Sequence, residues 1–244
     1  MNMKNLFKAK EIPFGELEQY GIAKEAFLDL PKKALDNLLT GRLSPLMKLS
    51  IEGKNGKIYS LPAKVKLHRN ADGTTALRIF PAMKEIRNDF SLTEKELGKL
   101  KDNQTIVKSI DRGNGTERCY LQLDKETNTV MHVKASEIHI PDAIGEAVIG
   151  GEQKERLRNG EPVEIHMEDT TVTVGVDLND RTGFKVIKGD LDEWRIKKLV
   201  EWDRITPGAT GYWQTSENGW EYRKEMERER EQERGKGYSR GRTF

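Results

Sequence analysis

The sequence is poor in the residues that usually carry chemistry, with one cysteine, Cys119, and four histidines among 244 residues. A single cysteine excludes an internal disulfide and a Cys-cluster zinc site, and it is typical of a reducing compartment. No apolar run approaches the roughly 18 residues of a membrane span. The first residues also lack the apolar core of a signal peptide. We therefore expect a cytoplasmic protein with no membrane partner.

Catalytic motifs are missing as well. There is no Gly-x-Ser-x-Gly nucleophile elbow, no Gly-x-x-x-x-Gly-Lys-Ser/Thr phosphate loop and no His-Glu-x-x-His zinc motif. The scattered histidines are His68, His132, His139 and His166, and the acidic residues that might meet across strands are Glu164, Glu168, Asp169 and Asp177. Neither set has metal-ligand spacing. The sequence therefore predicts a protein that is not an enzyme and has no metal or cofactor.

Charge of one sign is not in excess either, because 42 Lys and Arg stand against 40 Asp and Glu. Any basic surface must then be local. Charged residues make up 34% of the chain and hydrophobic residues 35%, so part of the chain is expected to lie outside any core.

What the chain does contain is a repeat. Three segments, residues 30–41, 92–103 and 149–160, each place two apolar anchors eight residues apart, on one face of a helix. Gly41, Asn103 and Gly160 then stand where a left-handed residue ends a helix. Strand-like stretches and turn-forming Asn, Asp and Gly follow each cap. This pattern predicts an α+β fold of tandem modules, each a helix followed by an antiparallel meander.

The same pattern sets the domain boundaries. We expect an N-terminal α+β domain at residues 1–88 and two repeat modules within residues 89–189, one at 89–143 and one at 144–189. A Trp-rich helix and linker would occupy residues 190–219, with Asp190 capping the helix. A charged helix and disordered tail would occupy residues 220–244, where Glu and Arg dominate.

Basic residues alternate with apolar ones in the first module. Lys64 and Lys66 alternate with Val65 and Leu67, so both lysines should share one face of a strand. Arg78 on the next strand could join them, and Arg69 ends the first strand. A row of cations suits the phosphates of DNA. We predict nucleic-acid contacts by Lys64, Lys66, Arg69 and Arg78; the alternative is an ordinary solvated sheet face.

All four tryptophans lie within residues 194–220. Tryptophan is enriched at interface hot spots, so Trp213 and Trp220 are predicted to contact a partner, a DNA-processing protein or bases. The alternative is that this segment folds back over the last sheet.

The second and third modules also resemble a domain of unknown function that is common on conjugative transposons and other mobile elements of gut bacteria. The first 85 or so residues are similar to the companion domain that usually precedes it. The residues that carry the resemblance in the first part are Ile12-Pro13-Phe14, Leu17, Gly21-Ile22, Leu38-Leu39, Gly41, Leu67-His68-Arg69-Asn70 and Asp72-Gly73. In the later part they are Leu123-Asp124, Thr127-Asn128, Ile138-His139-Ile140-Pro141, Gln153, Leu157, Gly160, Val163, Val176 and Arg181.

The resemblance implies an accessory role in handling mobile DNA, by association. Some members are fused to topoisomerase-like domains, which this sequence does not carry, so no topoisomerase activity is transferred to it. We expect a non-enzymatic accessory protein of a mobile genetic element that binds DNA or a DNA-processing complex. The alternative is a protein–protein adaptor that uses the Trp-rich segment without touching nucleic acid.

Overall fold

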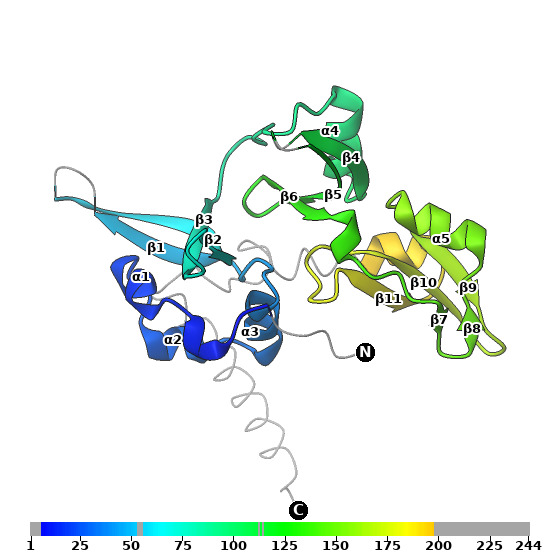
Figure 1. Cartoon of the computed structure of the whole chain (residues 1–244), viewed down its shortest axis with the longest axis horizontal. Helices are drawn as coiled ribbons and strands as arrows, with labels where there is room; N and C mark the ends of the chain where they lie inside the picture. The colour runs from blue at the N-terminus through cyan, green and yellow to red at the C-terminus, as the bar shows by residue number, and fades with distance from the viewer. Residues whose placement is uncertain (1–5, 53–55, 112, 114, 198–244) are drawn as a thin grey trace, which may run out of the picture.

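A computed structural model describes residues 6–52, 56–111, 113 and 115–197. The described part is α+β, with short helices and small antiparallel sheets (Figure 1), as predicted. No helix in this part is long and apolar enough to cross a membrane.

The N-terminal part builds one three-stranded sheet, in the order β1-β2-β3, with helices packed against one of its faces (Figure 1). Its elements are η1 (Ala9–Glu11), α1 (Phe14–Gln19), α2 (Lys24–Leu28), α3 (Lys32–Leu39), β1 (Met47–Glu52), β2 (Ile58–Arg69) and β3 (Thr75–Pro81). Val65 and Leu67 on β2 are buried in one apolar core with Phe27 and Leu38 from the helices. The face of β2 that carries Lys64 and Lys66 therefore points away from the helices.

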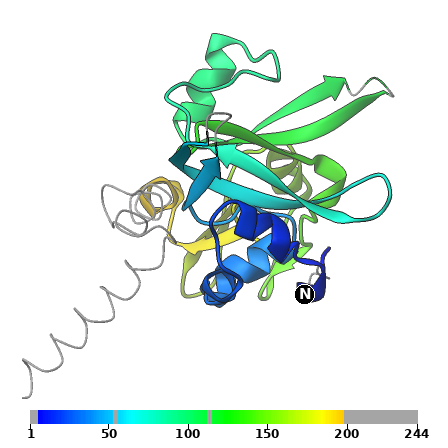
Figure 2. The same cartoon turned by 90° about the vertical axis from the view of Figure 1, so that its left-hand side faces the viewer.

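The second module has its own three-stranded sheet, in the order β4-β5-β6. Its elements are α4 (Glu94–Lys101), β4 (Ile106–Asp111), β5 (Thr116–Asp124), β6 (Thr129–Lys134) and η2 (Ala135–Glu137). The module lies on the side of the first sheet opposite the N-terminal helices (Figure 2).

The third module repeats this plan with the sheet order β11-β10-β9. Its elements are β7 (Ala143–Ile144), β8 (Ala147–Val148), α5 (Gly151–Arg158), β9 (Val163–His166), β10 (Thr171–Val176) and β11 (Phe184–Lys188). Residues 191–197 are helical, and the Asp190 Oδ1 accepts a hydrogen bond from the Glu193 N–H at 2.9 Å, so Asp190 caps this helix as predicted. The predicted charged tail lies outside the described residues.

The three repeats end their helices in the same way. Gly41, Asn103 and Gly160 have φ values of 72°, 60° and 82°, which confirms the predicted left-handed caps. In each, the next residue donates its N–H five residues back, as from Arg42 to the Asn37 carbonyl at 2.8 Å. This Schellman arrangement turns the chain sharply from helix to strand.

Modules two and three share a small apolar cluster. Tyr120, Val133 and Ile138 of the second module are buried against Val176 and Leu178 of the third. A single module buries little apolar surface alone, so this shared cluster stabilises both.

Candidate nucleic-acid interface

Two of the predicted basic residues lie side by side in the first sheet. Lys66 on β2 is the register partner of Arg78 on β3, so both side chains are on the same face. Arg78 is exposed and Lys66 is half-buried. The alternation of charged and apolar residues predicted this pairing correctly.

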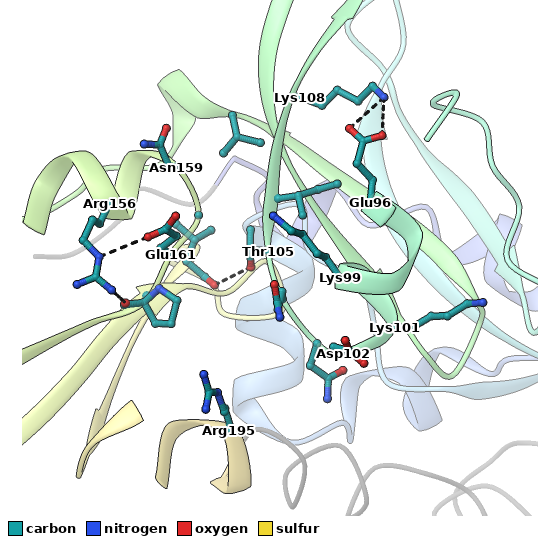
Figure 3. Close-up of a pocket in the computed structure, with 18 of the residues that line it drawn as sticks. Glu96, Lys99, Lys101, Asp102, Thr105, Lys108, Arg156, Asn159, Glu161 and Arg195 are labelled. Atoms are coloured by element: carbon teal, nitrogen blue, oxygen red, sulfur yellow. Dashed lines mark hydrogen bonds and ion pairs between the residues drawn. The ribbon is translucent and has the colours of Figure 1, made fainter. Parts of the chain in front are cut away.

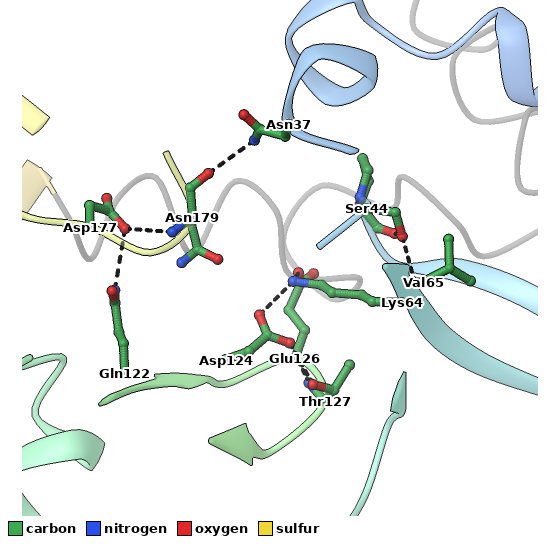
Figure 4. A network of polar contacts seen from close by, with 11 residues as sticks. Asn37, Ser44, Lys64, Val65, Gln122, Asp124, Glu126, Thr127, Asp177 and Asn179 are labelled. Carbon is green, nitrogen blue, oxygen red and sulfur yellow. Dashed lines mark hydrogen bonds and ion pairs between the residues drawn. The ribbon is translucent and has the colours of Figure 1, made fainter. Parts of the chain in front are cut away.

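Lys64, which we predicted to contact nucleic acid in a row with Lys66 and Arg78, is instead covered by protein. Its side chain is buried, and its Nζ forms ion pairs with Asp124 at 2.5 Å and Glu126 at 2.6 Å (Figure 4). Asp124 ends β5 and Glu126 lies in the turn between β5 and β6, so this corner of the second module covers this end of the face. Lys64 therefore joins two modules and has no side-chain surface to offer a phosphate in this arrangement.

Arg69 lies apart from the other three. It has the opposite parity on β2, and its guanidinium donates to the Glu11 Oε1 at 3.0 Å and to the Leu6 carbonyl at 3.2 Å. The same group lies 5.1 Å from the centre of the Phe7 ring. The structure thus places Arg69 against the N-terminal segment and does not bring it together with Lys66 and Arg78.

The predicted partner-binding residues Trp213 and Trp220 lie outside the described residues. Trp194, the first tryptophan of that segment, is buried against Gly175 on β10. At this position the indole is part of the body of the third module.

Another group of cations lines a groove between the second and third modules, which has a volume of about 1120 Å³ (Figure 3). Eight cationic side chains and three carboxylates line it. The cations are Lys95, Lys99, Lys101, Lys108, Arg118, Lys125, Arg156 and Arg195, and the carboxylates are Glu96, Asp102 and Glu161. This excess of positive charge contrasts with a whole chain of net charge +2.

Some of these charges are already paired within the groove. The Lys108 Nζ lies 3.0 Å from Glu96, and the Arg156 Nε lies 3.4 Å from Glu161. Arg118 donates to the Asn159 Oδ1 at 2.7 Å. These contacts fix the walls of the groove and neutralise two of its three carboxylates.

The lysines of α4 carry positive charge of the groove that is unpaired among the described residues. Lys95, Lys99 and Lys101 are exposed, and none forms an ion pair with any residue of the described ranges. Asn103 at the end of α4 has a buried Nδ2 without a hydrogen-bond partner in the same ranges. The α4 side of the groove therefore offers ammonium and amide donors to an anion.

The floor of the groove holds the two modules together. The Thr105 Oγ1 donates to the Val176 carbonyl at 3.2 Å (Figure 3). A Cβ on Gly160 would lie 2.7 Å from the Thr105 carbonyl oxygen, so only glycine allows this approach. Direct contacts between the modules therefore hold the two walls of the groove together.

The chemistry that this arrangement supports is the binding of a polyanion. Cations on both walls can neutralise successive phosphates of a nucleic-acid strand. Of the three carboxylates, Glu96 has its pKa lowered, chiefly by a hydrogen bond from the Thr93 backbone and further by Lys108. It therefore stays ionised and holds Lys108 in place. In the described ranges, no group of three or more His, Cys, Asp or Glu is placed to hold a metal ion.

Sequence reasoning missed this groove. Lys95 and Lys99 are one helical turn apart, which indicates a shared helix face, but nothing local shows which surface that face borders. The opposite wall comes from Arg156 and Arg195, far along the chain. Packing between modules creates the site.

Comparison with known proteins finds a similar family for the N-terminal part of the chain. Residues 7–91 match a family model described as a protein of unknown function (DUF4099), which covers about a third of the chain. The expectation of a domain of unknown function is thus confirmed for this part. No curated protein and no solved structure is significantly similar to the chain.

Proposed function

We propose that this protein is a non-enzymatic, cytoplasmic nucleic-acid-binding protein that contacts phosphates through the groove between its second and third modules. The observation that carries the proposal is the eight-to-three excess of cations over carboxylates on the groove walls. Two of these carboxylates are paired with other cations, and the third, Asp102, cannot balance all three exposed lysines of α4, so positive charge in the groove lacks a counterion among the lining residues. A nucleic-acid strand in the groove would supply that counterion.

The wider role in this proposal is that of an accessory protein of a mobile genetic element. Its support is the resemblance of both parts of the chain to domains found on such elements, together with the match of residues 7–91 to a family of unknown function. DNA is then the expected ligand, with a DNA-processing protein as a second partner.

The test is fluorescence anisotropy of labelled single-stranded DNA, duplex DNA and RNA with the purified chain, across a salt series. A triple variant, Lys95→Ala/Lys99→Ala/Lys101→Ala, should bind more weakly. The slope of log K against log salt should fall by up to about 0.7–0.9 for each lysine that contacts a phosphate. Alanine preserves the helix, so α4 should stay folded.

The matched control is Lys10→Ala/Lys32→Ala/Lys84→Ala, which removes the same charge from exposed lysines outside the groove. It should bind nearly as the parent does. Equal weakening in both variants would show that net charge alone matters, and no binding even at low salt would overturn the proposal.

A truncation separates this proposal from the adaptor alternative. Because Trp194 is buried and Arg195 lines the groove, the chain is cut after Lys197, so that both residues are kept. The proposal expects the shortened chain to keep its affinity for DNA. An adaptor would show no nucleic-acid binding before or after the cut and would lose capture of a protein partner.

A further inference from the structure

A second group of cations lies outside the groove, where the first sheet meets the third module. It consists of Arg42, directly after the Gly41 cap, together with Lys66 on β2 and Arg78 on β3. Arg42 reaches the third module, because a Cβ on Gly183 would lie 2.9 Å from the Arg42 Nη2. None of these cations lines the groove described above.

The guanidinium of Arg42 is buried without a partner. The residue is 7% exposed, and its Nε has no hydrogen-bond partner. The backbone N–H of Arg42 bonds to Asn37, but no side-chain hydrogen bond or ion pair joins the guanidinium to any residue that the structure describes. Burial lowers the pKa of Arg42, and the more distant Glu137, Asp180 and Asp177 offset this only in part. A buried cation of this kind is costly unless something pairs with it.

Lys66 adds to the excess of positive charge around Arg42. Burial lowers its pKa, and the positive charges of Arg42 and Arg78 lower it further, against the opposing effect of Glu137. Lys66 and Arg78 also form no ion pair within the described ranges. Three cations thus repel one another at one place in the molecule.

The nearby carboxylates form no ion pair with these cations among the described residues. The Asp180 Oδ1 accepts hydrogen bonds from the Thr182 N–H at 2.8 Å and the Thr182 hydroxyl at 2.7 Å. The Asp177 Oδ1 accepts from the Gln122 side chain at 3.3 Å, and Glu137 is exposed. The positive charge at Arg42 and Lys66 is therefore left for a ligand.

We propose that Arg42, Lys66 and Arg78 form a binding site for a phosphate dianion, either free phosphate or a phosphate monoester. Guanidinium groups match the oxygens of a phosphate in pairs, and a lysine adds a point charge. The buried Nδ1 of His68, two residues after Lys66 on the same face, has no hydrogen-bond partner and is a further polar group for the ligand. Because Arg42 is buried and Arg78 is exposed, the anion enters from the Arg78 side and only a terminal group reaches Arg42.

The experiment measures the melting temperature of the full chain in sodium phosphate against sodium chloride of equal ionic strength, with calorimetric titration of inorganic phosphate. Phosphate should raise the Tm of the parent chain in a saturable way. Arg42→Met should raise the Tm in chloride, because it removes an unpaired buried charge, and should weaken phosphate binding about tenfold or more. Lys66→Met should also lose most of the response, and it keeps the test valid if Arg42→Met does not fold.

The matched control is Arg87→Ala, which removes an arginine paired only with Asp89 at the surface and should keep the full response. A pair of oligonucleotides of the same sequence, one with a 5′-phosphate and one without, distinguishes a phosphate monoester from free phosphate as the ligand. Preference for the phosphorylated form supports a monoester, and binding of inorganic phosphate alone supports free phosphate. If phosphate has no effect on the parent chain, or if Arg42→Met and Lys66→Met both respond as strongly as the parent, the site is overturned and the groove proposal is untouched.

Discussion

Lys64 shows how much a single side chain can decide in this molecule. It is 6% exposed and pairs with two carboxylates that are themselves buried. Burial alone would favour the neutral amine, yet Asp124 and Glu126 outweigh it and raise the pKa of Lys64. Asp124 has other donors, since it also accepts from the Thr127 hydroxyl at 2.6 Å, whereas the Glu126 Oε1 has none. Glu126 therefore depends most on the lysine.

Replacing Lys64 should be strongly destabilising. Lys64→Met leaves two buried carboxylates without their cation, and breaking a buried pair in this way costs about 3–5 kcal/mol. The free energy of unfolding, measured by urea denaturation at pH 7, should fall by that amount. Lys84→Met, at an exposed position, should change it by less than about 0.5 kcal/mol.

A double variant checks the cause. Lys64→Met/Glu126→Gln removes the most dependent carboxylate together with the cation, so it should recover part of the lost stability. No recovery would mean that the unpaired Glu126 carboxylate is not the source of the lost stability.

At the scale of the element, α4 depends on a capping box. The Thr93 N–H donates to the Glu96 carboxylate at 2.8 Å, and the Glu96 N–H donates to the Thr93 hydroxyl at 3.3 Å. Glu96 also holds Lys108 on the neighbouring strand β4. One carboxylate thus fixes both the start of the helix and one wall of the groove.

The capping box predicts a pH dependence. The Thr93 backbone hydrogen bond and Lys108 lower the pKa of Glu96 below its ordinary value of 4.5. Between the two pKa values the unfolded chain binds more protons, so Glu96 stabilises the fold above pH 4.5 and this contribution is lost as the pH falls through the lowered value. The parent should exceed Glu96→Gln in stability at pH 7, and urea titrations should show this difference shrinking as the pH falls below 4.5.

Glu94→Gln is the control for this experiment. Glu94 lies in the same first turn and has the same charge, but its side chain makes no hydrogen bond with the residues that the structure describes. Its stability difference from the parent should change less with pH. A difference for Glu96→Gln that stays constant from pH 7 to pH 3 would contradict the assigned role of the carboxylate.

At the scale of the whole molecule, local patterns explain the elements but not the sites. The caps at Gly41, Asn103 and Gly160 depend on backbone conformation alone, so the sequence could predict them. The alternation of lysines with apolar residues in β2 also predicted that Lys64 and Lys66 share one face of the strand. Whether that face meets water or the β5–β6 turn depends on contacts some sixty residues apart, which no local pattern encodes. The groove has the same origin.

Gly183 is the position where all three parts of the chain meet. Its φ is +70°, and a Cβ there would lie 2.2 Å from the Ile138 Cδ1 of the second module and 2.9 Å from the Arg42 Nη2 of the first. A methyl group cannot fit without moving one of these neighbours. Gly183→Ala should therefore weaken the packing of the third module against Ile138 and Arg42, and it should also strain the backbone.

Gly73→Ala separates the two effects, because Gly73 has a φ of +83° and nothing within 4 Å of its Cβ position. It should lose only the backbone cost of a left-handed alanine, about 1 kcal/mol. Gly183→Ala should lose about 1–3 kcal/mol more through overpacking. Amide hydrogen exchange should then become faster in the loop after α3 and in the turn between β10 and β11, because loss of the contact between Gly183 and Arg42 exposes both segments to water. Equal costs for the two variants, with exchange unchanged in the α3 loop, would show that the modules do not depend on this contact to stay together.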